Sequence, residues 1–272
     1  MLNAGPRDAV ICIAGMHRSG TSMISRLLNL AGVYLGPAED LLPPADDNPE
    51  GFWENGHFAL VNQRILSEFG GRWDAPPAMP PRWQRDTRLV PVRRRAAALI
   101  ADFAEQAPWG WKDPRNCLTL EFWRDLIPGL KVLVSLRNPL DVAASLAARN
   151  GLSEAFSLDL WSFYHEQLLA RLAPQDRVVT HYDAYFDDPE RELARVLGLL
   201  GLHTRRDVVG RACRAIKTPL RHSRSSATEL GRRTAKRGVL NRYAALCAEA
   251  EFTVSDGRVA DRLENGSLAP NG

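Results

Sequence analysis

The residues at 15–22, GMHRSGTS, have the types and the spacing of a loop that binds phosphate. They follow an apolar run at 10–14 and precede a run at 21–30 whose apolar residues recur at helical spacing. This order predicts a strand, a loop and a helix. A glycine-bounded turn before a helix directs several backbone N–H groups, and the positive end of the helix dipole, at one point. The sequence therefore predicts an anion site in this loop.

The loop lacks the lysine that nucleoside-triphosphate hydrolases place after its second glycine. Gly20 is followed by Thr21 and Ser22. In the hydrolases that lysine reaches the β- and γ-phosphates and the following hydroxyl holds Mg²⁺, so its replacement argues against triphosphate cleavage. Arg18, inside the loop, supplies a cation that can bind a terminal anionic group through two hydrogen bonds. We expect a site that binds a phosphate-like group.

Two further apolar runs end in residues suited to anion chemistry. The run at 131–136 is followed by Arg137, and the helix expected over 140–149 carries Ser145. A strand-end Arg and a Ser two turns along the next helix can converge on one phosphate. The run at 109–112 ends at Lys112 and is followed by Pro two residues later.

The elements that must position these residues alternate between strands and helices. A further strand is expected over 177–180, and further helices over 58–69, 92–106, 158–172 and 189–200. This alternation predicts an α/β fold with a parallel sheet and helices on both of its faces. Ligands bind such sheets at the carboxyl ends of the strands, where the residues named above lie.

Composition and charge limit the classes of function. The chain has 272 residues, 45% of them hydrophobic and 25% charged, which fits one α/β domain with a full core. A net charge of +3 is too small to indicate nucleic-acid binding. No apolar stretch approaches the roughly 18 residues of a membrane span, and the first residues lack the features of a signal peptide. We therefore expect a cytoplasmic protein, with its four scattered cysteines reduced and mostly buried.

A phosphate loop that lacks the lysine and carries a basic residue resembles that of the sulfotransferases that use 3′-phosphoadenosine-5′-phosphosulfate, PAPS. The segment VLVSLRNPLDVAASL resembles the 3′-phosphate motif of this family, with Arg137 and Ser145 in the matching positions. The segment VVTHYDAYFDDPERELARVLGLLGL resembles the one whose tyrosine packs near the nucleotide, which Tyr182 matches. The three blocks run in family order over residues 10–202.

The resemblance implies a P-loop fold with three layers, α/β/α, and a central parallel sheet. It implies one sulfotransferase domain over 1–272, which comprises the strand, 5′-phosphosulfate loop and helix at 10–30, acceptor-side loops at 32–85, the 3′-phosphate motif at 131–149 and a basic lid at 205–237. The residues expected to bind PAPS, or its product adenosine 3′,5′-bisphosphate, are His17, Arg18, Ser19, Gly20, Thr21, Ser22, Arg137, Ser145, Tyr182, Arg221 and Arg224.

The resemblance also implies in-line transfer of a sulfuryl group to a hydroxyl or amine, with no metal required. Lys112 matches a lysine that reaches the bridging oxygen of the donor, and Arg18 is expected to add positive charge there. In the cytosolic small-molecule branch a catalytic histidine follows two residues after this lysine, but here that position is Pro114. The general base is therefore expected to be Glu54 or Asp113. Asp46, Asp47 and Glu50 are rivals to Glu54.

Each of these assignments has a structural alternative. Glu54 also suits a loop carboxylate that caps a helix or forms a salt bridge, and Asp113 suits a structural partner of Arg115. The basic stretch at 205–237 is either a lid over an anion or a solvated surface. The aromatic residues within 32–85 either line the acceptor site or pack on the core.

The acceptor is expected to be a carbohydrate or another small hydroxylated molecule. We expect no nucleic-acid or membrane partner, and we leave homodimer formation open. Two other classes of function remain, namely a P-loop small-molecule kinase and a non-catalytic module that binds a nucleotide.

Overall fold

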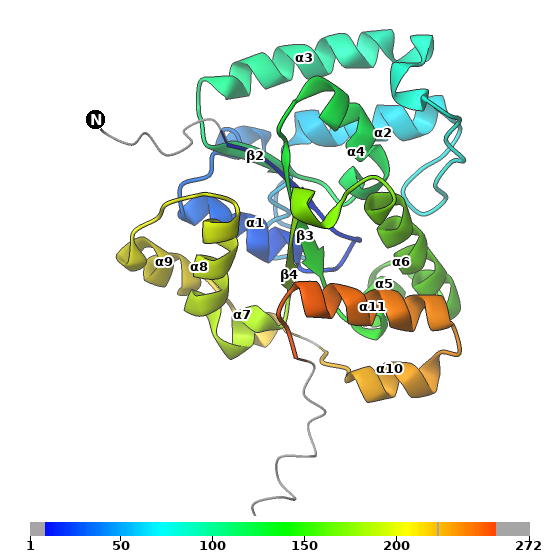
Figure 1. Ribbon diagram of the computed structural model, residues 1–272, viewed down its shortest axis with the longest axis vertical. Helices are drawn as coiled ribbons and strands as arrows, with labels where there is room; N and C mark the ends of the chain where they lie inside the picture. Colours follow the sequence, from blue (N-terminus) through cyan, green and yellow to red (C-terminus); the bar gives the residue numbers. More distant parts are fainter. Residues whose placement is uncertain (1–8, 222, 254–272) are drawn as a thin grey trace, which may run out of the picture.

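Four parallel strands form the centre of the computed structural model, which describes residues 9–221 and 223–253 (Figure 1). They lie in the order β2-β1-β3-β4 and span Val10–Ala14 (β1), Trp109–Lys112 (β2), Lys131–Leu136 (β3) and Arg177–His181 (β4). All pairings are parallel. The strands are short, apolar and covered on both faces, as in other parallel sheets. The predicted α/β fold with a central parallel sheet is confirmed.

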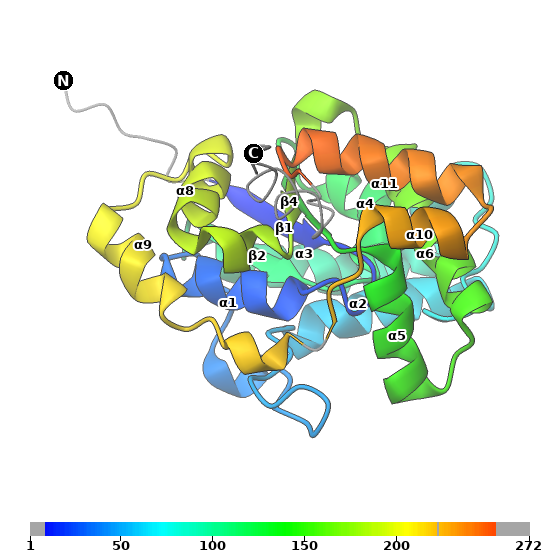
Figure 2. The same cartoon turned by 90° about the horizontal axis from the view of Figure 1, so that it is seen from below.

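Helices cover both faces of this sheet, which gives the predicted three layers (Figure 2). One layer contains α1 (Thr21–Leu30), α7 (Ala184–Asp187), α8 (Pro189–Leu199) and α9 (Arg206–Cys213). The other contains α2 (Gly56–Glu68), α3 (Val90–Ala104), α4 (Asn116–Leu126), α5 (Pro139–Asn150), α6 (Glu154–Leu169), α10 (Ala227–Arg233) and α11 (Arg237–Glu249). Short 3₁₀ turns lie at Ala38–Asp40, Trp83–Arg85, Thr87–Leu89, Pro174–Asp176 and Thr218–Leu220.

The order of the strands fixes where a ligand site can form. β1 lies between β2 and β3, and the chain crosses from β2 through α4, past β1, to reach β3. The chain leaves β1 toward β2 on one side and leaves β3 toward β4 on the other. These opposite directions open a crevice at the carboxyl ends of β1 and β3. Gly15 follows β1 at this point, and a Cβ atom there would lie 2.6 Å from the carbonyl oxygen of Ser135 on β3. Only glycine allows the two strand ends to approach so closely.

A buried amide network joins the helices to the strands near this crevice. Asn62 of α2 donates to Asn116 of α4 at 2.8 Å and accepts from the indole N–H of Trp123 at 2.8 Å. Asn116 in turn donates to the carbonyl oxygen of Ile13 at 2.9 Å and accepts from Trp111 at 3.0 Å. Because each amide is buried and hydrogen-bonded, the network fixes α2 and α4 relative to β1 and β2.

Several element boundaries differ from those expected. α6 begins at residue 154 rather than 158, because Ser153 caps it by accepting a hydrogen bond from the N–H of Phe156 at 3.3 Å. α4 and the last three helices, α9 to α11, were not expected from the sequence. The four cysteines are free and buried, as expected. Within residues 9–221 and 223–253, no helix has the length and apolar character to cross a membrane.

We predict that two buried histidines make the fold sensitive to acid. Burial lowers the pKa of His165 to about 4, and burial together with the nearby Arg137 lowers that of His181 to about 3. Both values lie below the value of about 6.5 for an unfolded chain. The stabilisation from the neutral rings is therefore complete above pH 6.5 and is lost as the pH falls toward 4. Each ring adds a slope of up to about 1.4 kcal/mol per pH unit in that range.

Urea unfolding at pH 7, 6 and 5 measures this loss. The variant His165→Gln should show a shallower decline than the wild type, because it removes one of the titrating rings. A free energy of unfolding that is equal at pH 7 and pH 5 in the wild type would contradict the assignment.

Candidate active site

The loop between β1 and α1 presents unpaired hydrogen-bond donors to a cavity. α1 has no side-chain cap and no acidic residue in its first turn, and Gly20 precedes it with a φ of 81°. In the described part of the chain, the backbone N–H groups of Gly20, Thr21 and Ser22 donate to no protein acceptor. The hydroxyl of Ser19 is also buried without a partner there. Such a helix N-terminus suits an anion.

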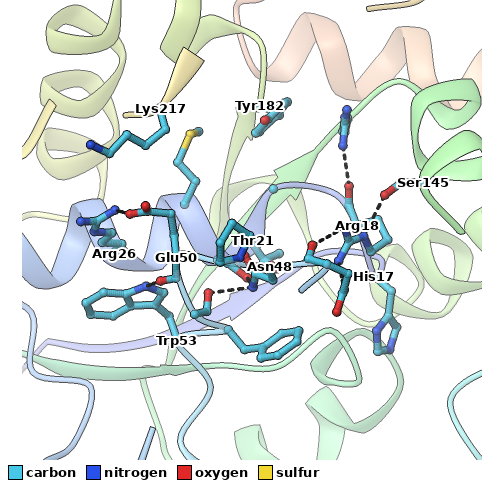
Figure 3. Close-up of a pocket in the computed structure, with 18 of the residues that line it drawn as sticks. His17, Arg18, Thr21, Arg26, Asn48, Glu50, Trp53, Ser145, Tyr182 and Lys217 are labelled. Atoms are coloured by element: carbon cyan, nitrogen blue, oxygen red, sulfur yellow. Dashed lines mark hydrogen bonds and ion pairs between the residues drawn. The ribbon is translucent and has the colours of Figure 1, made fainter. Parts of the chain in front are cut away.

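Tyr182 holds this loop from the β4 side. A Cβ atom on Gly20 would lie 2.1 Å from the Tyr182 ring, so the loop needs glycine both for its φ and for this contact. The cavity has a volume of about 560 Å³. Its walls come from the loop and α1, from residues 46–54, from α5 and from Ala215, Lys217 and Ser223 (Figure 3).

Arg137 and Ser145 reach the same residue of the loop. Arg137 donates to the carbonyl oxygen of Arg18 at 3.1 Å and to the hydroxyl of Ser223 at 3.3 Å. Its guanidinium lies over the Tyr182 ring, 4.7 Å from the centroid, and its Nε is buried without a partner in the described chain. Ser145 accepts a hydrogen bond from Nε of Arg18 at 2.8 Å (Figure 3). The structure therefore brings together the two residues of the predicted 3′-phosphate motif.

The Arg18 side chain extends toward α5 and does not contact Lys112. Besides Ser145, it binds the carboxylate of Asp47 at 2.9 Å and the backbone carbonyl of Asp47 at 3.2 Å. Burial lowers the pKa of Arg18, whereas Asp47 raises it. Its expected action at the leaving group remains a prediction.

Lys112 and Glu54 form a buried ion pair. The Lys112 ammonium lies 2.6 Å from Oε1 of Glu54 and 3.3 Å from the hydroxyl of Ser22, and only 1% of its side chain is exposed. Glu54 keeps 12% of its side chain exposed, toward the cavity that both residues line. Segments far apart in the sequence thus place an ammonium and a carboxylate beside the first turn of α1.

Asp113 is engaged by a single neighbour. It is fully buried, and its two oxygens accept three hydrogen bonds from Arg115, each of 2.8 Å, from the backbone N–H, Nε and Nη2. It does not line the cavity. The geometry corresponds to the structural alternative given above for Asp113, and of the two expected bases only Glu54 lines the cavity.

His17 connects the loop to the segment after α2. Its ring lies 4.5 Å from that of Trp73 and 5.9 Å from that of Tyr164. Burial, followed by the charge of Arg115 and Lys112, lowers the pKa of His17 well below its ordinary value, so the ring is neutral at pH 7. Of the aromatic residues in 32–85, Phe52 and Trp53 line the cavity, whereas Phe58 and Trp83 belong to the core.

The basic stretch at 205–237 contains α9 and α10, and its action as a lid remains a prediction. Arg221 pairs with Asp183, Arg224 lies 3.6 Å from Asp187, and the Ser225 hydroxyl donates to Asp141 at 2.7 Å. Lys217 and Ser223 line the cavity, whereas Arg221 and Arg224 do not. His222, expected beside them, lies outside the described residues.

Several residues that line the cavity were not predicted from the sequence to bind a ligand. They include Arg26, Arg149, Lys217 and Ser223, together with Asp46, Asp47 and Glu50, which were considered only as rival bases. The alternation of acidic and aromatic residues in DDNPEGFWEN was the available signal for a loop at a site. Among the residues that the structure describes, no group of three or more His, Cys, Asp or Glu is arranged to hold a metal ion.

We predict that Asp113→Asn destabilises the fold. Removing one partner of a buried ion pair leaves an uncompensated charge, here on Arg115, and costs about 3–5 kcal/mol. Chemical denaturation measures the loss, with the exposed Asp46→Asn as the matched control. A loss below about 1 kcal/mol would show that the Asp113–Arg115 pair is not structural.

Comparison with known proteins agrees with this geometry. A family model described as "Sulfotransferase family" matches residues 10–207. Sulfotransferase STF9 from Mycobacterium avium matches with a TM-score of 0.53 and 11% identity, over 92% of this chain and 78% of that one. The sulfotransferase domain of the Synechococcus PCC 7002 olefin synthase matches with a TM-score of 0.50 and 16% identity, over 89% and 93%.

At these identities the structural matches show a shared fold alone. The curated proteins contain no match to this chain. The family model, however, covers the sheet, the phosphate loop and the 3′-phosphate motif, which is most of the chain. This protein belongs to the sulfotransferase family.

Proposed function

We propose that this protein transfers a sulfuryl group from PAPS to a hydroxyl or amine of a small-molecule or glycan acceptor. The observation that carries the proposal is the position of Arg137 and Ser145, which line the same cavity as a phosphate loop without the hydrolase lysine. Such a cavity suits a nucleotide that bears an anionic group at each of two positions.

The unpaired donors of the cavity fit this nucleotide. The N–H groups at the start of α1 and the buried hydroxyl of Ser19 suit the 5′-phosphosulfate, and the unpartnered Nε of Arg137 suits the 3′-phosphate. Tyr182 lies between the loop and Arg137, where it can pack against the nucleotide. A volume of about 560 Å³ is within the usual range for ligand sites, roughly 300–1,000 Å³.

The ion pair of Lys112 and Glu54 suits the two charges of an in-line transfer. PAPS supplies the sulfuryl group and leaves negative charge on the phosphate oxygen. Lys112, beside Ser22 and the helix N-terminus, provides the positive charge that stabilises this developing negative charge. Glu54 faces the cavity and accepts the proton of the acceptor hydroxyl. Asp113 is less suited to this step, because Arg115 occupies both of its oxygens.

The two other classes of function lack such support. A P-loop kinase needs a lysine after the second glycine, or another device that holds Mg²⁺ and a triphosphate, and this chain has Thr21 there. A non-catalytic module would need no base. Here the Lys112 ammonium contacts both Glu54 and Ser22, so a carboxylate lies close to the start of α1. The family match does not favour either alternative.

Ligand-dependent melting and product formation test the proposal together. Adenosine 3′,5′-bisphosphate at 100 times its Kd should stabilise the protein by about 2.7 kcal/mol, whereas ATP with Mg²⁺ should not. Radiolabelled PAPS should then label a member of a panel of sugars, phenols and amines. Stabilisation by ATP with Mg²⁺ alone would indicate a kinase. Binding of the bisphosphate without transfer to any acceptor would indicate the non-catalytic module.

Arg137→Ala should weaken binding of adenosine 3′,5′-bisphosphate by about 2–5 kcal/mol, the range for truncation of one partner of a buried charge pair. Ser145→Ala removes a neutral hydroxyl and should cost less. Titration calorimetry gives both values. Arg124→Ala, a partly exposed arginine outside the cavity, is the control. Unchanged affinity in Arg137→Ala would show that this residue does not bind the 3′-phosphate.

Glu54→Gln should lower turnover by about 10²–10⁴-fold with little change in donor affinity, because the amide keeps the shape of the side chain and cannot accept the proton. The matched control is Glu50→Gln, in the same loop, whose carboxylate pairs with Arg26. Equal losses in the two variants would remove Glu54 from the role of base.

A further inference from the structure

Asp47 occupies the position between two arginines that border the donor cavity. One oxygen of its carboxylate, Oδ2, lies 2.9 Å from Nη1 of Arg18 and 3.0 Å from Nε of Arg149 on α5. The carbonyl oxygen of Asp47 accepts a further hydrogen bond from Arg18 at 3.2 Å. A carboxylate thus holds the only side-chain cation of the phosphate loop.

This carboxylate compensates only part of the positive charge around it. The charges of Arg149 and Arg137 lower the pKa of Arg18, in addition to the larger effect of burial, and Asp47 opposes them. Nε of Arg137 is buried and has no partner in the described chain. The three guanidiniums therefore form a group with more positive charge and more donors than Asp47 satisfies, and a bound anion would relieve their mutual repulsion.

The segment that carries Asp47 has other anchors. Arg149 lies over the ring of Phe52, 5.4 Å from its centroid, and Glu50 pairs with Arg26 on α1 (Figure 3). If Arg18 turned to another anion, Asp47 would keep its bond to Arg149 and the segment would remain attached to α5 and α1. The same segment continues to Glu54.

We propose that Asp47 is an internal anion that holds Arg18 in the free enzyme and is exchanged for a phosphate of the donor. Arg149 retains the Asp47 carboxylate after the exchange. Asp47 and Arg149 are then positioning residues that set the affinity for the donor, and donor binding releases one tether of the segment that carries Glu54. This inference rests on the proposed function, because it requires a phosphorylated donor in this cavity.

The exchange predicts that loss of the Asp47 charge strengthens donor binding. In Asp47→Asn, Arg18 no longer has to leave a carboxylate, so adenosine 3′,5′-bisphosphate should bind roughly fivefold more tightly in titration calorimetry. Asp102→Asn is the matched control, because Asp102 on α3 is exposed, lies outside the cavity and has no ion pair within the described residues. It should change the affinity by less than about twofold, since exposed charges are screened by salt. A defect in folding cannot produce tighter binding.

Arg149 gives a second measurement of the same exchange. Arg149→Gln leaves Asp47 with Arg18 as its only partner, so the bisphosphate should bind roughly threefold more weakly. In the Asp47→Asn background the same substitution should have no effect. Equal weakening in both backgrounds would show that Arg149 does not act through Asp47, and would overturn its part in the exchange.

The outcomes separate this inference from the proposed function. Tight binding by the wild type, with no gain in Asp47→Asn over Asp102→Asn, would overturn the exchange and leave the donor site in place. A wild type that does not bind the bisphosphate would overturn the proposed function, and the exchange with it.

Discussion

Positive charge gathers at the carboxyl ends of the four strands, and the loops around these ends are held by the carboxylates that balance it. Lys112 is almost fully buried and pairs with Glu54. Arg221 pairs with Asp183 at the end of β4. Because a buried cation without a partner is costly, each of these pairs fixes a loop to the sheet as well as a charge to its place.

The parallel sheet explains why these charges meet. β1 and β3 are neighbours whose connections leave in opposite directions, so the phosphate loop and the 3′-phosphate motif face one crevice. Close packing then fixes the loop. Gly15 lies against the backbone of Ser135, and Gly20 lies against the ring of Tyr182. The uncapped start of α1 is thereby directed into the cavity rather than toward solvent.

Local patterns in the sequence were sufficient to predict the parts of the fold that build the candidate site. β1 and β3 are apolar runs, and α5 begins at a proline, so all three could be recognised from the sequence. Because the strands are parallel, the residues that follow them lie at the same edge of the sheet. α4 was missed because its sequence, NCLTLEFWRDL, mixes polar and aromatic residues. Its polar Asn116 is buried and satisfied by Asn62, more than 50 residues away, and no local pattern reveals such a partner.

The charge pairs of the site could not be predicted from the sequence either, because their partners are also far apart along the chain. Lys112 and Glu54 are 58 residues apart, and Asp47 meets Arg149 only because the segment at 46–54 crosses from α1 to α5. The residue types indicated which side chains could do chemistry. Which carboxylate faces which cation depends on how the long connection after α1 folds, and that is a property of tertiary packing.

The central claim is that the cavity recognises a nucleotide through its 3′-phosphate, and one pair of affinities tests it. Adenosine 3′,5′-bisphosphate and adenosine 5′-monophosphate differ only in that group. If Arg137 and Ser145 bind it, the bisphosphate should bind at least about 30-fold more tightly, since a buried charge pair is worth roughly 2–5 kcal/mol. Affinities within about threefold of each other would contradict the account.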